Sequence, residues 1–160
     1  MKLIFALLLI FTASLARAQT TAANGTAIPH PTSTATYPVT TASGTVNVPQ
    51  GMVYIPAGSF TWSTGTTQET RTTDGYCIGR FEVTNEEWKT WLNATGRTTY
   101  PSHWSGGTYP AGKANHPVLY ISLNEALLYT AWISAQTGWN VTVPTSDQWE
   151  KAARGPNAYL

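Results

Sequence analysis

Few side chains of this 160-residue sequence can take part in covalent or metal chemistry. The sequence has one cysteine, three histidines and eight acidic residues. Cys77 has no second cysteine with which to form a disulfide or share a soft metal ion. It stands between Tyr76 and Ile78 in a segment typical of a strand. We therefore expect Cys77 to be a small buried apolar residue; the alternatives are a reactive thiol or a copper ligand.

The histidines raise the question of a metal site. Two imidazoles, His103 and His116, could bind Zn²⁺ or Fe²⁺ together with an acid from elsewhere. His103 lies among Pro, Ser and Trp residues, which favours a surface loop, and we predict no metal site. Neither a Gly-x-Ser-x-Gly segment nor a histidine placed to serve a nucleophile is present, so no catalytic residue is predicted.

One segment favours ligand binding. Residues 97–117 are rich in Gly, Pro and aromatic residues and predict a long irregular loop, a feature that in a compact domain usually indicates either a function or a wrong assignment of elements. Planar side chains suit contacts with a sugar or a peptide. The candidate binding residues are Tyr100, His103, Trp104 and Tyr109. The alternative is that these rings pack over the core.

Three helices that would position this loop are predicted from sequence patterns typical of helix N-termini. Each begins with a capping box, in which a Ser or Thr is followed three residues later by Glu or Gln. The boxes are Thr84 with Glu87, Ser122 with Glu125, and Thr145 with Gln148. Their predicted buried faces are Trp88, Trp91, Leu92 and Thr95; Leu123, Ala126, Leu127, Thr130, Ala131 and Ser134; and Trp149, Ala152 and Ala153. Gly96, Gly138 and Gly155 are predicted to end the helices.

Short apolar or alternating segments predict the strands. They are residues 52–55, 57–62, 76–83 and 139–143, with residues 63–75 expected to form a loop. In the third of these segments, Tyr76 and Ile78 lie on one face and Cys77 on the other.

The N-terminus predicts export. Lys2, the apolar residues 3–15 and the sequence Ala16-Arg17-Ala18 form a signal peptide, 1–18, cleaved before Gln19. The alternative, a membrane anchor, needs a longer apolar run. We expect a secreted or periplasmic protein without a membrane span after cleavage. Residues 19–50 predict a Thr/Pro-rich flexible linker, with an edge strand near 45–48 as an option, and 51–160 the folded domain.

Composition limits the partners. A net charge of +1 with 11% charged residues is too sparse to neutralise a run of phosphates, so we expect no nucleic-acid binding. The single cysteine excludes an intramolecular disulfide framework. Burial of apolar surface must stabilise the fold.

Four segments follow one another through the predicted domain: 51–60, 78–88, 116–126 and 143–155. In this order they resemble the formylglycine-generating enzyme, or sulfatase-modifying factor, family. The resemblance spans about residues 51–155. It implies an irregular α+β fold of the C-type-lectin-like kind, and it implies that His116, in the sequence His-Pro-Val, is part of the fold.

The resemblance also implies chemistry that lies elsewhere. Family members that oxidise a sulfatase cysteine bind Cu(I) through a cysteine pair in the C-terminal half of the domain, and hold Ca²⁺ in that half. This sequence stops at Leu160, near the point where relatives continue. We therefore expect an N-terminal portion of the domain, without catalytic, copper or calcium residues of its own.

Two functional hypotheses remain. The chain is an exported, non-catalytic scaffold that binds a peptide, glycan or protein outside the cytoplasm. Alternatively, it is the N-terminal part of a copper-dependent oxidase that converts a sulfatase cysteine to formylglycine. The present sequence favours the scaffold, because the catalytic cysteine pair is absent from it.

Overall fold

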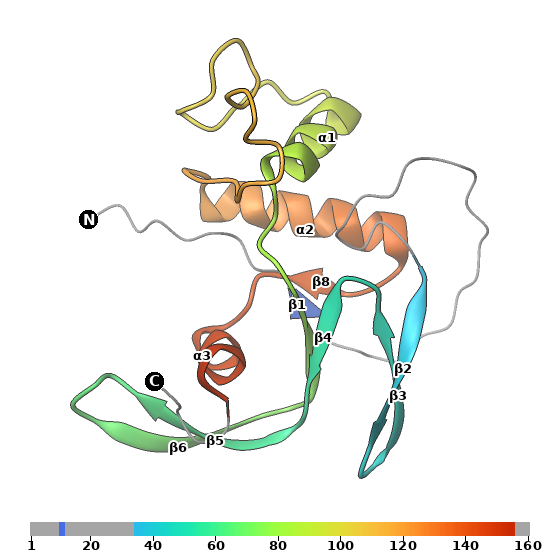
Figure 1. Ribbon diagram of the computed structural model, residues 1–160, viewed down its shortest axis with the longest axis vertical. Helices are drawn as coiled ribbons and strands as arrows, with labels where there is room; N and C mark the ends of the chain where they lie inside the picture. The colour runs from blue at the N-terminus through green and yellow to red at the C-terminus, as the bar shows by residue number, and fades with distance from the viewer. Residues whose placement is uncertain (1–9, 12–33, 156–160) are drawn as a thin grey trace.

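The computed structural model describes residues 10–11 and 34–155 (Figure 1). Within these ranges it is a mixed α/β structure with three helices and small antiparallel sheets. The strands are β1 (Ile10–Phe11), β2 (Thr36–Thr41), β3 (Gly44–Pro49), β4 (Met52–Ile55), β5 (Gly58–Ser63), β6 (Gln68–Thr73), β7 (Tyr76–Gly79) and β8 (Val141–Thr142). The helices are α1 (Asn85–Thr95), α2 (Leu123–Thr137) and α3 (Ser146–Arg154).

The central sheet has the strand order β4-β7-β1-β8. All four residues of β7 are buried, because the strand has neighbours on both edges and packed side chains on both faces. Cys77 contributes to the larger core, whereas Tyr76 and Ile78 form a smaller cluster on the other face. The predicted division of these three residues between two faces is confirmed.

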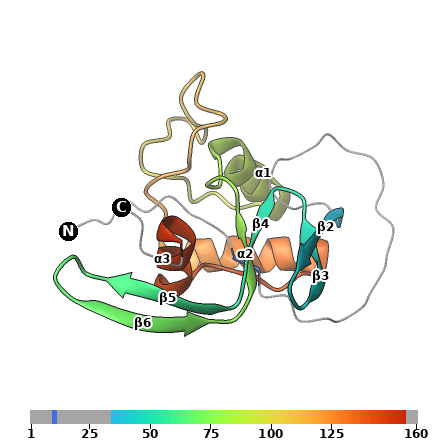
Figure 2. The same ribbon diagram turned by 60° about the horizontal axis from the view of Figure 1, so that its bottom comes forward.

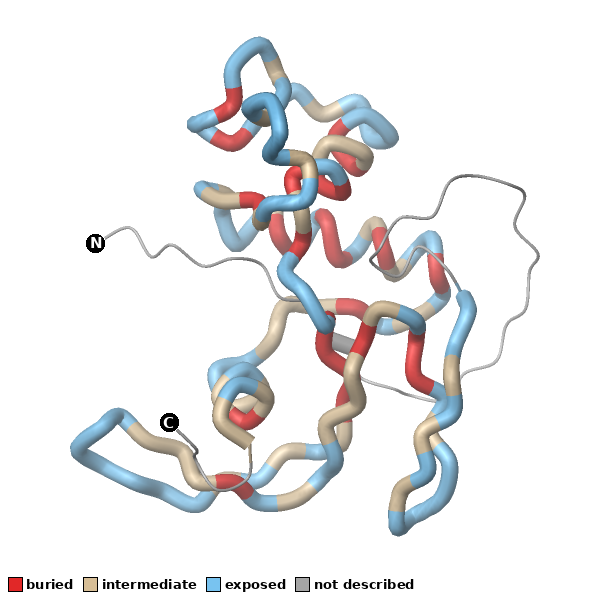
Figure 3. Tube along the Cα trace, viewed as in Figure 1, coloured by how far each residue is buried: buried red, intermediate tan, exposed pale blue. Residues whose placement is uncertain are grey.

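An aromatic core joins α1 to α2. The Trp88 ring stacks on Tyr129 with centroids 5.2 Å apart, and meets Trp91 edge-on at 4.6 Å. Trp91 in turn packs edge-on against Tyr129. The predicted buried residues of α1, apart from the exposed Thr95, are therefore correct. Figure 3 shows buried positions concentrated in these helices and the central strands.

Polar contacts attach α3 to the β5–β6 hairpin and to the turn before it, at the end of the molecule away from α1. Below α3, the β5–β6 hairpin curves along the helix (Figure 2). The Lys151 ammonium donates to the carbonyl oxygens of Pro56 and Gly58 and to the Thr73 hydroxyl, at 2.7, 2.9 and 3.0 Å. Arg71 of β6 donates to Asp147 in the first turn of α3 at 2.7 Å.

All three predicted capping boxes are present. In each, the Ser or Thr hydroxyl accepts from the third backbone amide, and the Glu or Gln side chain accepts from the backbone amide of the capping residue. Gly96 and Gly138 end α1 and α2 in the left-handed conformation, with φ of 66° and 73°. Local signals thus located the helix starts correctly.

The predicted buried faces of α2 and α3 are wrong in part. Leu123 and Leu127 are 66% and 43% exposed, whereas Tyr129 and Ile133 are buried. Sequence could not choose between the faces, because α2 is apolar nearly all round and has a single charged residue, Glu125. In α3, Trp149 is 46% exposed and the buried residue is Lys151.

Two other expectations differ from the structure. Residues 68–73 form β6 where a loop was expected, because pairing with β5 supplies the order that their polar sequence does not indicate. Residues 36–49 form the β2–β3 hairpin inside the range that composition assigns to a flexible linker. Tyr37 donates its hydroxyl to the Met52 carbonyl at 2.7 Å and Val48 is fully buried, so this hairpin is attached to the domain.

The predicted signal peptide, 1–18, lies outside the described residues except for β1, which pairs with β7 and β8. The cleavage position after Ala18 and residues 19–33 of the predicted linker also lie outside them. Among the described residues, no helix is both long and apolar enough to cross a membrane.

Candidate functional site: the loop over helix α1

The loop of residues 97–117 is attached to the start of α1. Asn85 donates its amide nitrogen to the Lys113 carbonyl at 2.8 Å and accepts from the Trp104 indole nitrogen at 3.2 Å. Its backbone amide donates to the His116 carbonyl. Asn85 is buried, so the first residue of the helix fixes the loop at three points.

Three of the four predicted binding residues form a stack. The Trp104 ring is 8% exposed and joins the core, with Tyr100 stacked 6.4 Å away and Tyr109 edge-on at 5.4 Å. Tyr100 is 38% exposed and forms the outer layer. Trp104 therefore supports the surface from beneath, and Tyr100 is the ring that a ligand can reach.

Polar contacts hold the outer rings in place. The Tyr109 hydroxyl donates to the Glu86 carboxylate at 2.6 Å, and this hydrogen bond raises the pKa of Tyr109. The Lys89 ammonium lies 5.1 Å from the Tyr100 ring centroid and donates to the Gly107 carbonyl. A Cβ at Gly107, where φ is 74°, would lie 2.9 Å from the Tyr100 ring, so only glycine fits beneath it.

The fourth predicted residue, His103, lies apart from this stack. It is exposed, as expected of a surface loop, and its ring lies 5.3 Å from that of Tyr120. Tyr120 is half exposed and has φ of 58°, a left-handed conformation that a bulky residue seldom adopts. Sequence gave no signal for Tyr120, nor for Lys89 and Asn85, because their role depends on contacts between distant segments.

The loop thus presents rigid planar surfaces, with the Glu86 carboxylate and the Lys89 ammonium beside them. Such an arrangement can bind a flat or extended ligand, because planar side chains lose little conformational entropy when they make contact. We call Tyr100, Trp104 and Tyr109 the aromatic stack.

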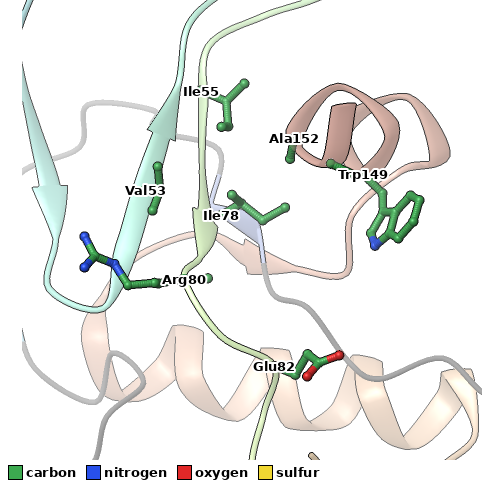
Figure 4. A pocket seen from close by; sticks show the side chains of 9 residues that line it. Val53, Ile55, Ile78, Arg80, Glu82, Trp149 and Ala152 are labelled. Atoms are coloured by element: carbon green, nitrogen blue, oxygen red, sulfur yellow. The ribbon is translucent and has the colours of Figure 1, made fainter. Parts of the chain in front are cut away.

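A groove lies between the central sheet and α3, separate from the loop (Figure 4). This open groove has a volume of about 360 Å³ and an apolar floor of Val53, Ile55 and Ile78, with Trp149 on its α3 side. Arg80 and Glu82 lie at one end of it. Glu82 is exposed, although its neighbours in sequence, Phe81 and Val83, are apolar.

The remaining candidates for chemistry are structural. Cys77 is buried, and burial raises the pKa of its thiol to about 11, so it is protonated at neutral pH. The His116 backbone closes a turn with Lys113 and accepts from Asn85. Within residues 10–11 and 34–155, no group of three or more His, Cys, Asp or Glu side chains could hold a metal ion.

The structure is a mixed α/β domain with capped helices and a long loop fixed to α1, and residues 37–159 match the family model of the sulfatase-modifying factor enzyme 1-like domain. The match covers more than half of the chain. The protein therefore belongs to this family.

A curated relative is a formylglycine-generating enzyme from Streptomyces coelicolor. The two sequences are 33% identical over 69 residues, a stretch that is 41% of this chain and 18% of the enzyme. The chain thus matches less than a fifth of that relative's length.

Proposed function

We propose that this chain is an extracytoplasmic binding scaffold of the sulfatase-modifying-factor family, and that the aromatic stack is its binding surface. The proposed ligand is an extended peptide. The observation that carries the proposal is an accessible ring, Tyr100, held on a buried support, Trp104, by contacts that fix both. A pre-organised ring binds without the entropic cost of ordering a mobile loop.

A peptide is favoured over a glycan by the family relationship, since the relative is named for generating formylglycine, an amino-acid residue. Backbone groups also face the site: the Gly107 carbonyl receives the Lys89 ammonium beside the Tyr100 ring. Lys89 brings a positive charge to the rim, and the Glu86 carboxylate on Tyr109 brings a negative charge.

The test begins with a displayed library of linear peptides selected on the full chain. An enriched peptide should bind the Tyr100→Ala variant about tenfold more weakly, the effect of losing one stacked ring. Trp149→Ala is the matched control, because it removes an exposed ring from the separate groove beside α3. Calorimetric titration of the three proteins measures the difference.

Equal affinity of all three proteins for the enriched peptides would disprove the assignment of the surface. A glycan array probed in parallel separates the ligand classes: enrichment there, lost in Tyr100→Ala, would replace the peptide by a glycan.

The finer features of the proposal follow from the family and the N-terminal sequence. We propose a C-type-lectin-like architecture for the complete domain, export through the signal peptide 1–18, and a secreted or periplasmic location. Nucleic acid is not proposed as a partner, because the charge is too sparse.

A second candidate function is favoured by the segment that is 33% identical to a formylglycine-generating enzyme. Under this second candidate, the chain is the N-terminal part of a copper-dependent oxidase. The described residues would contribute the scaffold, since the buried, protonated Cys77 does not suit a copper ligand. Copper-dependent oxidation of a cysteine-containing peptide by the full-length protein that contains this chain would decide for this candidate.

A further inference from the structure

The central sheet contains a strand that comes from outside the family domain. β1 lies between β7 and β8 and is antiparallel to both (Figure 1). Ile10 is opposite Ile78 on one side and Thr142 on the other, and Phe11 is opposite Cys77 and Val141. The match to the family model starts at residue 37. β7 and β8 thus belong to the common domain, and their shared neighbour does not.

The position between β7 and β8 requires an occupant. These two strands run parallel to each other and lie about 10 Å apart, twice the spacing of neighbouring strands. They therefore cannot pair directly. Cys77 and Ile78 are buried, and unpaired backbone groups at buried positions are costly. Without β1, β8 has no strand partner among the described residues.

The surroundings determine which kind of strand fits. Side chains on an inner strand alternate between the faces of the sheet. On one face lies the core that contains Cys77 and Val141, and on the other the cluster of Tyr76 and Ile78. No charged residue lies in β7 or β8, so a charged occupant would meet no counterion on its neighbouring strands. An uncharged apolar strand fits, and residues 3–15 carry no charge.

We propose that the slot between β7 and β8 is a strand-acceptor site, and that β1 of this chain, Ile10–Phe11, is its occupant. The same residues that are predicted to direct export then complete the sheet while they remain attached. Removal of the segment opens the facing edges of β7 and β8. This proposal concerns the sheet and is independent of any ligand at the aromatic stack.

The first experiment requires no substitution in the sheet or its occupant. A specific protease site replaces residues 22–28, which lie outside the described strands, and the folded full chain is cut there. The N-terminal piece should stay with the body in size-exclusion chromatography. A synthetic peptide of residues 7–14, with lysines appended for solubility, should displace it. Release of the piece on cutting, with hydrogen exchange in β7 unchanged, would overturn the proposal.

The second experiment uses the uncut chain. Successive backbone amides of an inner strand donate to the neighbouring strand on one side and then on the other. Proline at both Ile10 and Phe11 therefore removes hydrogen-bond donors to the strands that line the slot. Hydrogen exchange should quicken at least about tenfold at alternate amides of 76–79 and at the Thr142 amide, whereas amides 88–92 of α1 stay protected. Thr21→Pro is the control for the added proline.

Unchanged exchange in β7 and β8 of the double-proline variant would show that β1 does not fill the slot. If exchange instead rises throughout, the variant has unfolded globally. The cut-chain experiment then decides, since its sheet sequence is intact. A peptide of residues 7–14 carrying both prolines should fail to displace the native piece, which separates strand pairing from non-specific apolar adhesion.

Discussion

The two ends of this molecule attach a helix to the rest of the fold by opposite means. α1 is held by ring contacts among Trp88, Trp91 and Tyr129, all fully or almost fully buried. α3 is held by a buried ammonium, Lys151, and by the ion pair of Arg71 with Asp147. Apolar packing depends on area and shape, whereas the polar attachment depends on a few directed hydrogen bonds. The two ends should therefore fail differently when one side chain is removed.

The largest effect is expected at the α1 end. Trp88→Ala should lower the free energy of unfolding by about 4 kcal/mol, because it removes a large buried ring and leaves a cavity between Trp91 and Tyr129. Denaturant titration followed by circular dichroism measures the loss. Since this core includes residues of α1, α2 and the central sheet, the whole domain should unfold at lower denaturant.

Two variants sharpen this prediction. Trp88→Phe should cost much less, because it keeps a ring; within the described part of the chain, the Trp88 indole nitrogen has no hydrogen-bond acceptor to lose. Trp149→Ala should change stability by less than about 1 kcal/mol, since that ring is largely outside the core. Similar losses in Trp88→Ala and Trp149→Ala would refute the contrast between buried and exposed rings.

A smaller and more local effect is expected at the α3 end. Lys151→Met keeps an apolar stem but removes the donors to Pro56, Gly58 and Thr73, at a cost of about 2 kcal/mol. The β5–β6 hairpin should loosen before the core does. Hydrogen exchange in residues 58–63, compared with 88–92, measures this difference.

Arg154→Met is the matched control, because Arg154 pairs with Glu150 along the same helix and does not reach the hairpin. It should cost about 0.5 kcal/mol and leave exchange in residues 58–63 unchanged. Equal loosening by both variants would mean that Lys151 is not the specific attachment.

The same contrast explains what could be predicted from the sequence. The capping boxes and the spacing of Trp88 and Trp91 are local signals, and both gave the correct helix and the correct face. The role of Lys151 depends on carbonyl groups more than 90 positions away in sequence, and no local pattern indicates them. For α2, apolar residues on nearly all sides left the buried face undetermined.

The same contrast between local signals and distant contacts applies to the candidate site. A loop rich in Gly, Pro and rings was recognisable from composition, and Tyr100, Trp104 and Tyr109 do lie together. Which ring is exposed was not predictable, because it depends on the hydrogen bond from Trp104 to Asn85. His103 lies apart for a related reason, since its neighbour Tyr120 comes from the segment that follows the loop.

The smallest predicted effect compares one motif at both ends. Thr84 and Thr145 cap α1 and α3 in the same way, yet Thr84 also donates its hydroxyl at 2.7 Å to the carboxylate of Glu87, which is buried. Thr84→Ala should therefore cost about 2 kcal/mol and Thr145→Ala, at an exposed position, about 0.5 kcal/mol. Thermal unfolding of the two variants measures the difference. Thr84→Ser should restore most of the stability, because a serine hydroxyl makes the same hydrogen bonds. If Thr84→Ala and Thr145→Ala lose the same stability, burial of Glu87 adds nothing to the cap of α1. The capping box would then contribute equally at the apolar and the polar end.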